Sequence, residues 1–283
     1  MQRRSEGRKK AIAVCGPTAS GKSDLADHLA GMLSTNATVV DSMQVYREIP
    51  SITNQRRRRE ANLVGIISVT EEWNVALHRE AVRRLERELP LLVLDAGTGM
   101  YLNAVLLEIQ LWPRVEEELR KRARALARGS ENERRETRKI ELSLIGAKTE
   151  SSIWEGDLRY DTTLVYLRPD REMLDEMIER RSTRIAREGL EEAEKIYDMV
   201  RGGEPVREQV MGSIGVRELL GVVKGEIPRE EARRRIAART RRMARRQIRW
   251  FDKLARSLSG KAEVLVAESA SEMMGRAVPW TGT

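Results

Sequence analysis

The chain of 283 residues has one cysteine, two histidines and no long apolar segment. Cys15 cannot form an internal disulfide, and its place in a short apolar run predicts a core residue. His28 and His78 lie in helical patterns without recognisable partners, which predicts ordinary helix residues. No run approaches the roughly 18 apolar residues of a membrane-spanning helix. We therefore expect a cytoplasmic protein.

Positive charge is abundant and is concentrated near the end of the chain. The formal net charge is +8, and the segment from Arg229 to Arg256 contains twelve basic and three acidic residues. A local excess of this kind indicates a polyanionic partner. A second basic run, the four arginines at 56–59, is predicted to be a solvated loop.

Residues 16–23 carry a phosphate-binding motif. They read Gly-Pro-Thr-Ala-Ser-Gly-Lys-Ser and match G-x-x-x-x-G-K-[ST] between a predicted strand at 11–15 and a predicted helix at 24–33. The backbone N–H groups and Lys22 would bind a di- or triphosphate, and the Ser23 hydroxyl would hold Mg2+. The candidate phosphate-binding residues are Gly16, Thr18, Ala19, Ser20, Gly21, Lys22 and Ser23.

Short apolar runs alternate with helical patterns, which predicts an α/β fold with a P-loop NTPase-like parallel sheet flanked by helices. Further strands are predicted at residues 37–40, 91–94, 161–167 and 262–267, and helices at 74–89, 170–188, 190–200, 206–223 and 228–258. Residues 113–156 are charged helices with little core. We therefore expect a helical insertion at 113–156 within a catalytic core formed by 1–112 and 157–283.

Two predicted strands end at an aspartate. Asp41 and Asp95 fall at the carboxyl ends of strands beside the phosphate-binding loop, where ligands bind in open α/β sheets. Either could be a Mg2+ ligand, as in a phosphotransferase, or a general base. Thr98, in the glycine-containing loop that follows, could donate a hydrogen bond to a phosphate or a leaving oxygen.

The predicted helix at 228–258 has a basic stripe. Cations recur along it at spacings of four and three residues, so they share one face. A row about 30 Å long, at roughly 1.5 Å per residue, suits a nucleic-acid backbone. The members of the stripe are Arg235, Arg239, Arg242, Arg246, Arg249, Lys253 and Arg256.

Several motifs in order resemble the tRNA dimethylallyltransferases. They are the loop at 16–23, Asp-Ser-Met-Gln-Val-Tyr at 41–46, Gly-Thr-Gly-Met-Tyr at 97–101, and the segments at 178–181, 212–218 and 240–251. The resemblance implies transfer of a dimethylallyl group from dimethylallyl diphosphate to N6 of adenosine 37 in tRNA.

The resemblance also implies roles for individual residues. Asp41 matches the general base for the adenine N6, Thr98 a residue near the transferring group, and Arg181 an arginine on the diphosphate. We expect a monomer that binds the anticodon stem-loop. The candidate tRNA contacts are Ser42, Gln44, Arg242, Arg246, Gln247 and Arg249.

The sequence departs from the family pattern at Gln55, Asp95, Ala96 and Val216, and its helical insertion is short. Three alternative functions stay open at this point. An isopentenyltransferase for free adenine nucleotides would share the phosphate-binding loop but would not need the basic stripe. A P-loop nucleotide kinase would use Asp95 for Mg2+, and a catalytically idle RNA-binding protein would use only the stripe.

Overall fold

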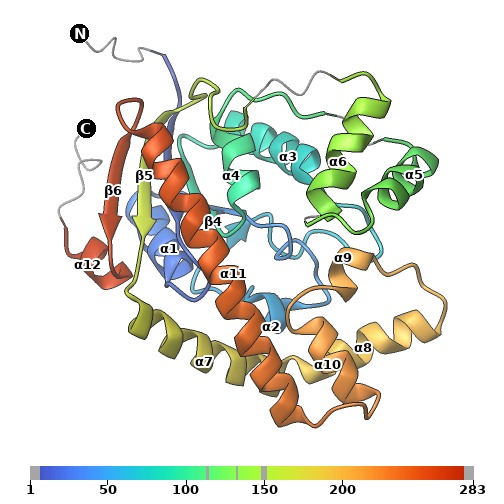
Figure 1. Cartoon of the computed structure of the whole chain (residues 1–283). Coiled ribbons are helices and arrows are strands. Elements are labelled where there is room, and N and C mark those ends of the chain that lie inside the picture. The colour runs from blue at the N-terminus through green and yellow to red at the C-terminus, as the bar shows by residue number, and fades with distance from the viewer. Residues whose placement is uncertain (1–6, 113–114, 132, 148–151, 277–283) are drawn as a thin grey trace. The chain divides into compact units, whose positions relative to one another are not determined.

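The computed structural model describes residues 7–112, 115–131, 133–147 and 152–276. Its centre is a parallel sheet of six strands (Figure 1). The predicted α/β fold class with a parallel sheet is therefore confirmed. Across the sheet the strands follow the order β3 (Ala61–Asn62), β2 (Ala37–Val40), β4 (Leu92–Ala96), β1 (Lys10–Cys15), β5 (Asp161–Leu167) and β6 (Glu263–Ala267).

Helices cover both faces of this sheet. On one face, α1 (Lys22–Met32) and α12 (Ala270–Met274) pack against the strands, and Val14 of β1 shares a buried cluster with Leu25 of α1. α11 (Arg229–Leu258) passes in front of β5 and continues beyond the sheet (Figure 1). α11 also contacts α4 (Gly99–Leu106), on which α3 (Val75–Glu88) packs. The long helix predicted at 228–258 is confirmed.

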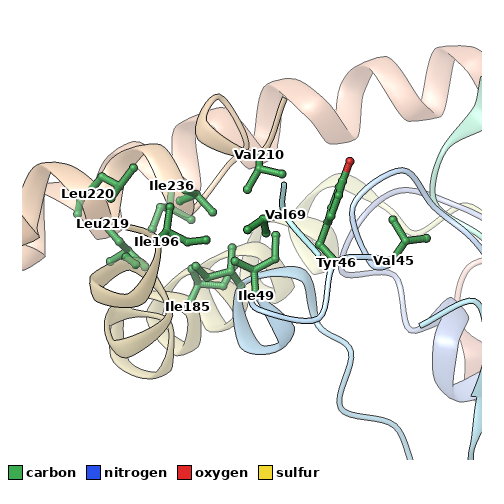
Figure 2. Close-up of a cluster of buried hydrophobic side chains, with 14 residues drawn as sticks. Val45, Tyr46, Ile49, Val69, Ile185, Ile196, Val210, Leu219, Leu220 and Ile236 are labelled. Atoms are coloured by element: carbon green, nitrogen blue, oxygen red, sulfur yellow. The ribbon is translucent and has the colours of Figure 1, made fainter. Parts of the chain in front are cut away.

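A second buried cluster joins the segment after β2 to a group of helices (Figure 2). Tyr46 and Ile49 follow β2 and pack with Ile185, Ile196 and Leu219 from three helices. This packing fixes the segment after Asp41 against α11, which contributes Ile236 to the cluster and carries the basic stripe. The helices of the cluster region are α2 (Pro50–Thr53), α7 (Arg171–Glu188), α8 (Leu190–Arg201), α9 (Glu208–Met211) and α10 (Val216–Val223).

The chain divides into two compact units. One comprises Met1–Leu106 with Leu158–Thr283 and contains the sheet, and the other is Leu107–Asp157. The second unit contains α5 (Glu117–Ala127) and α6 (Glu133–Leu144), which pack on each other.

Three predicted elements differ from the structure. The helix predicted at 206–223 is interrupted between α9 and α10, because Gly215 adopts φ +100° and its N–H donates to the Glu218 carboxylate (2.9 Å). The strand predicted at 91–94 extends to Ala96, so Asp95 lies inside β4 and not after it. The loop expected after Asp95 turns into α4 from Gly99.

His78 is a buried residue of α3, as expected for a helix residue, but it has partners that the sequence pattern does not reveal. Trp73 Nε1–H donates to His78 Nδ1 (3.3 Å), and the Tyr101 ring lies 5.1 Å from the imidazole, centroid to centroid. Burial lowers the pKa of His78 to about 4. Among the helices of the described residues, none is long and apolar enough to cross a membrane.

Candidate active site

The phosphate-binding loop connects the end of β1 to the start of α1. A Cβ atom on Gly16 would lie 2.7 Å from the Leu167 carbonyl oxygen, so only glycine fits there. Ala19 and Gly21 adopt left-handed backbone conformations, with φ +70° and +81°. Left-handed residues that alternate with right-handed ones turn successive N–H groups toward one point and form an anion-binding concavity. Thr18 and Ser20 of the loop are buried, and the Ser20 hydroxyl has no hydrogen-bond partner in the described structure.

Two cations at this loop have no counter-ion in contact. Lys22 is 8% exposed, and the side chains of Lys22 and of Arg181 in α7 form no hydrogen bond or ion pair within the described residues. Burial lowers the pKa of Lys22, with Asp95 and then Asp41 opposing that shift. Burial and the nearby Arg184 lower the pKa of Arg181 to about 10. Unpaired cations in a buried site are costly, so this arrangement favours an anionic ligand.

A cavity of about 460 Å³ opens beside the loop. Six basic side chains contribute to its wall, which makes it strongly electropositive. Ser23 lies in the wall, as expected for a hydroxyl that meets a phosphate-bound cation. The lining residues are Ala19, Gly21, Lys22, Ser23, Asp24, Asp27, Asn54, Arg56, Arg57, Met177, Arg180, Arg181 and Arg184.

Asp41 and Thr98 meet at the neighbouring strand ends. Asp41 Oδ1 accepts the N–H groups of Met43 (2.8 Å) and Gln44 (3.2 Å), so the carboxylate is held in one orientation. The Thr98 hydroxyl donates to Asp41 Oδ2 (3.3 Å) and accepts the Ser42 N–H (3.1 Å). Ser42, Gln44 and Thr98 are thus gathered around Asp41.

Gly97 shows how closely these groups approach the phosphate-binding loop. A Cβ atom at this position would lie 2.5 Å from Asp41 Oδ2 and 3.4 Å from Lys22 Cε. The carboxylate oxygen that accepts only a hydroxyl hydrogen bond therefore lies next to the buried ammonium side chain. Strand order explains the meeting, because β2, β4 and β1 are neighbours and their carboxyl ends share one sheet edge.

α11 holds the two loops of this site together. Gln247 Oε1 accepts the Thr18 N–H (2.8 Å), and Gln247 Nε2 donates to the Gly97 carbonyl (2.7 Å). One turn along the helix, the Trp250 ring lies where a Cβ atom on Gly99 would be, so this position also requires glycine. Gln247 was expected to contact tRNA, but its amide is engaged by two backbone groups of the protein.

The arginine run at 56–59 is not a solvated loop throughout, because the side chain of Arg57 is 4% exposed. Arg57 forms ion pairs with Asp95 (2.6 Å) and Asp27 (2.7 Å) and donates to the Ser23 carbonyl (3.3 Å). The two carboxylates are buried, and a guanidinium can satisfy both at once. The sequence pattern gave no signal for this pairing, since Arg57 and Asp95 are far apart along the chain.

Ion pairs neutralise the first part of the basic stripe of α11 but not the arginines that follow. Near its start, Arg235 pairs with Glu231 (2.7 Å), and Arg239 pairs with Glu218 (2.5 Å), so this part is neutralised. Farther along, exposed arginines have no ion pair within the described residues. They are Arg242, Arg245, Arg246, Arg249 and Arg256.

Ion pairs between α7 and α11 fix the helix that carries these arginines. Glu179 of α7 pairs with Arg233 (2.6 Å) and with Arg241, and Arg241 also pairs with Asp175 (3.0 Å). The hydrogen bonds from Arg241 and Arg233 lower the pKa of Glu179. Arg181 of the cavity belongs to the same helix, which these ion pairs hold against α11.

Comparisons with known proteins agree on one family. The model of the IPP transferase family matches residues 44–254. A tRNA dimethylallyltransferase of Rubrobacter xylanophilus is 54% identical over 271 residues, which cover 93% of this chain and 93% of that protein. The crystal structure of the full-length tRNA isopentenylpyrophosphate transferase of Bacillus halodurans is 28% identical, with a TM-score of 0.65, over 92% of this chain and 90% of that chain.

A eukaryotic dimethylallyltransferase acting on tRNA has the same fold, with a TM-score of 0.71 at 22% identity over 95% of this chain and 76% of that chain. The likeness thus extends over nearly the whole length of the sequence and is not confined to the phosphate-binding motif. The chain belongs to the IPP transferase family of tRNA dimethylallyltransferases, which confirms the resemblance seen in its motifs.

Proposed function

We propose that the protein transfers a dimethylallyl group from dimethylallyl diphosphate to N6 of adenosine 37 in tRNA and releases diphosphate. The observation that carries this proposal is one sheet edge at which Asp41 Oδ2, which accepts only a hydroxyl hydrogen bond, lies near two unpaired cations, the buried Lys22 and the partly buried Arg181. One side of the site suits an anionic leaving group, and the other suits proton removal.

The diphosphate would lie on the loop of residues 16–23. Its oxygens would accept the converging N–H groups at the start of α1, and Lys22 and Arg181 would stabilise the negative charge that grows as the allylic C–O bond breaks. Arg181 is a planar cation that can bind two phosphate oxygens. The cost of holding the buried Lys22 and the partly buried Arg181 without a counter-ion would be offset when the substrate binds.

Asp41 would act as the general base. The exocyclic amine of adenine is a poor nucleophile because its lone pair is delocalised into the ring. As N6 bonds to the allylic carbon, one N6 proton passes to Asp41 Oδ2 and the electron pair of the C–O bond leaves with the diphosphate. The N–H groups of Met43 and Gln44 bind Oδ1 and hold the carboxylate in place. The Thr98 hydroxyl donates a hydrogen bond to Oδ2, the proposed proton acceptor.

Mg2+ fits the donor set of the cavity. Mg2+ is usually held by one or two protein oxygens together with phosphate oxygens and water, so a cluster of carboxylates is not required. No group of three or more His, Cys, Asp or Glu side chains that could hold a metal occurs among the residues described. Ser23 would be the protein ligand, and the ion would neutralise charge on the diphosphate when bound.

The anticodon stem-loop would lie along the exposed arginines of α11. Arg242, Arg246 and Arg249 would contact the phosphate backbone. Gln44 would help to orient the extruded adenine, because its side chain is 7% exposed and its Oε1 has no hydrogen-bond partner in the described structure. An exocyclic amine is a donor that this oxygen can accept. A cytoplasmic location and a monomeric state stay predictions.

The alternatives fit the site less well. A kinase of this fold would present the aspartate on the strand beside β1 to Mg2+, but Asp95 Oδ2 is paired with Arg57. An enzyme for free adenine nucleotides would not need the exposed arginines of α11. A catalytically idle RNA-binding protein would not need unpaired cations beside Asp41.

The test is a comparison of acceptors. The protein with Mg2+ and labelled dimethylallyl diphosphate is offered an anticodon stem-loop containing adenosine 37, the same RNA with guanosine at that position, AMP, or ATP. We expect label in the adenosine-containing RNA alone. Transfer to AMP or ATP at an equal rate would contradict the proposal, and so would consumption of ATP without dimethylallyl diphosphate.

A further inference from the structure

Arg57 occupies a position that the proposed reaction does not explain. It comes from the segment between α2 and β3, and its side chain crosses to β4 and α1. Nη1 donates to Asp95, Nε and Nη2 donate to Asp27, and Nη2 also reaches the Ser23 carbonyl at the end of the phosphate-binding loop. Most of its donors are thus engaged by the protein, although the side chain lines the cavity.

Of the two carboxylates paired with Arg57, Asp95 is the one on the strand next to the phosphate-binding loop. It lies in β4 opposite Val14 of β1, the strand that leads into the loop, and it is 1% exposed. Its Oδ1 has no hydrogen-bond partner among the described residues, and its Oδ2 is bonded to Arg57. A buried carboxylate is stable only when it is paired with a cation.

Lys22, which is buried and unpaired, is the candidate to replace Arg57 as the partner of Asp95. Lys22 Cε lies 3.4 Å from where a Cβ atom on Gly97 would be, two residues after Asp95, and Arg57 itself reaches the carbonyl of Ser23, the residue after Lys22. If Arg57 were absent, Asp95 would keep a buried negative charge with neither oxygen bonded. The unpaired lysine next to it would then be drawn into an ion pair and would be lost to an incoming anion.

We propose that Arg57 is a positioning residue of the diphosphate site, which holds Asp95 so that Lys22 stays free to bind the diphosphate. This inference rests on the proposed function, because it assumes that the loop binds a diphosphate. It also gives a reason for the departure of Asp95 from the family pattern: the additional carboxylate is accompanied by its own buried cation.

The experiment measures the affinity for inorganic pyrophosphate by calorimetry, with a chelator present so that no metal contributes. Five proteins are compared: the unmodified chain, Arg57→Gln, Asp95→Asn, the double variant, and a control variant. Glutamine at position 57 can still donate one hydrogen bond to Asp27. Arg58→Gln is the matched control, because Arg58 is largely exposed and lies 3.8 Å from the exposed Asp24.

We expect Arg57→Gln to bind pyrophosphate about tenfold more weakly or worse, because a buried charge loses its partner. Asp95→Asn and the double variant should bind within about threefold of the unmodified chain, since no carboxylate then competes for Lys22. Recovery of affinity in the double variant is the decisive result when Arg57→Gln is itself folded, because the weaker binding of the folded single variant then comes from the Asp95 charge and not from lost structure. Thermal unfolding of each variant shows that it is folded, and if Arg57→Gln fails to fold, the double variant alone decides.

Two results would overturn the inference while leaving the proposed function intact. One is an Arg57→Gln variant that binds pyrophosphate as well as the unmodified chain. The other is a double variant that binds as weakly as Arg57→Gln, which would make Arg57 a direct ligand. If the unmodified chain does not bind pyrophosphate at all, the proposed donor site is wrong and the inference falls with it.

Discussion

Replacement of Asp41 by asparagine removes the proposed base and little else. The Asn side-chain oxygen can still accept the N–H groups of Met43 and Gln44, so the turn after β2 keeps its hydrogen bonds. Alanine would leave both N–H groups without an acceptor, at about 1–3 kcal/mol for each buried group. Asparagine therefore separates the chemistry of Asp41 from its structural contacts.

The expected loss follows from the role of the carboxylate. A positioned general base contributes about 10²–10⁴-fold to a rate, which is about 3–5 kcal/mol of activation free energy at roughly 1.4 kcal/mol per factor of ten. The amide cannot take the N6 proton, so the rate of transfer should fall by at least about 100-fold. Affinity for tRNA should stay nearly unchanged, because the basic residues of α11 are untouched.

The assay is single-turnover transfer of labelled dimethylallyl to an anticodon stem-loop, together with filter binding of the same RNA. A matched control is Asp24→Asn, since Asp24 lies in the cavity wall but is exposed. An Asp41→Asn variant with an undiminished rate would refute the base role. So would a loss of RNA affinity as large as the loss of rate, because Asp41 would then contribute to binding rather than to the chemical step.

Three further predictions test other parts of the account. Replacement of Arg242, Arg246 and Arg249 by glutamine should weaken tRNA binding and reduce its salt dependence by about one slope unit per lost phosphate contact, and an unchanged slope would remove this face from the interface. Gln247→Leu removes two hydrogen bonds of about 1 kcal/mol each, so kcat/KM for the diphosphate substrate should fall about tenfold or more while tRNA affinity stays constant, and the reverse pattern would restore Gln247 as a tRNA contact. In the folded protein burial lowers the pKa of His78 to about 4, so below its ordinary pKa the unfolded chain takes up a proton that the native state does not. Stability relative to His78→Gln should therefore fall by up to about 3 kcal/mol as the pH drops from about 6.5 to 4, and parallel stability curves would contradict this.

The main features of the site were predictable because they depend on local patterns. The loop at 16–23 is defined by fixed spacings, and the meeting of Asp41 with Thr98 follows from parallel strands that end at one sheet edge. The family resemblance rested on several such motifs in order, and the family model and the 54% identical relative confirm it. No comparison tests the roles of the individual residues, so those stay proposals.

The features that were missed depend on partners distant in the sequence. Arg57 reads as one of four surface arginines until Asp27 and Asp95 are known to lie beneath it. The periodicity of α11 groups Gln247 with core-facing residues, but it cannot reveal that the amide reaches Thr18 and Gly97. Local hydrophobic patterns carry no information about which buried charges pair across the fold.

The central claim is tested most directly by analysis of the nucleosides and the released ions of one reaction. Unmodified tRNA is incubated with the protein, Mg2+ and dimethylallyl diphosphate, then digested and analysed by mass spectrometry, while pyrophosphate is measured in the same sample. The account predicts N6-dimethylallyladenosine at position 37, with one pyrophosphate released for each modified nucleoside. Pyrophosphate or phosphate release without a modified adenosine, or a modified base at another position, would contradict it.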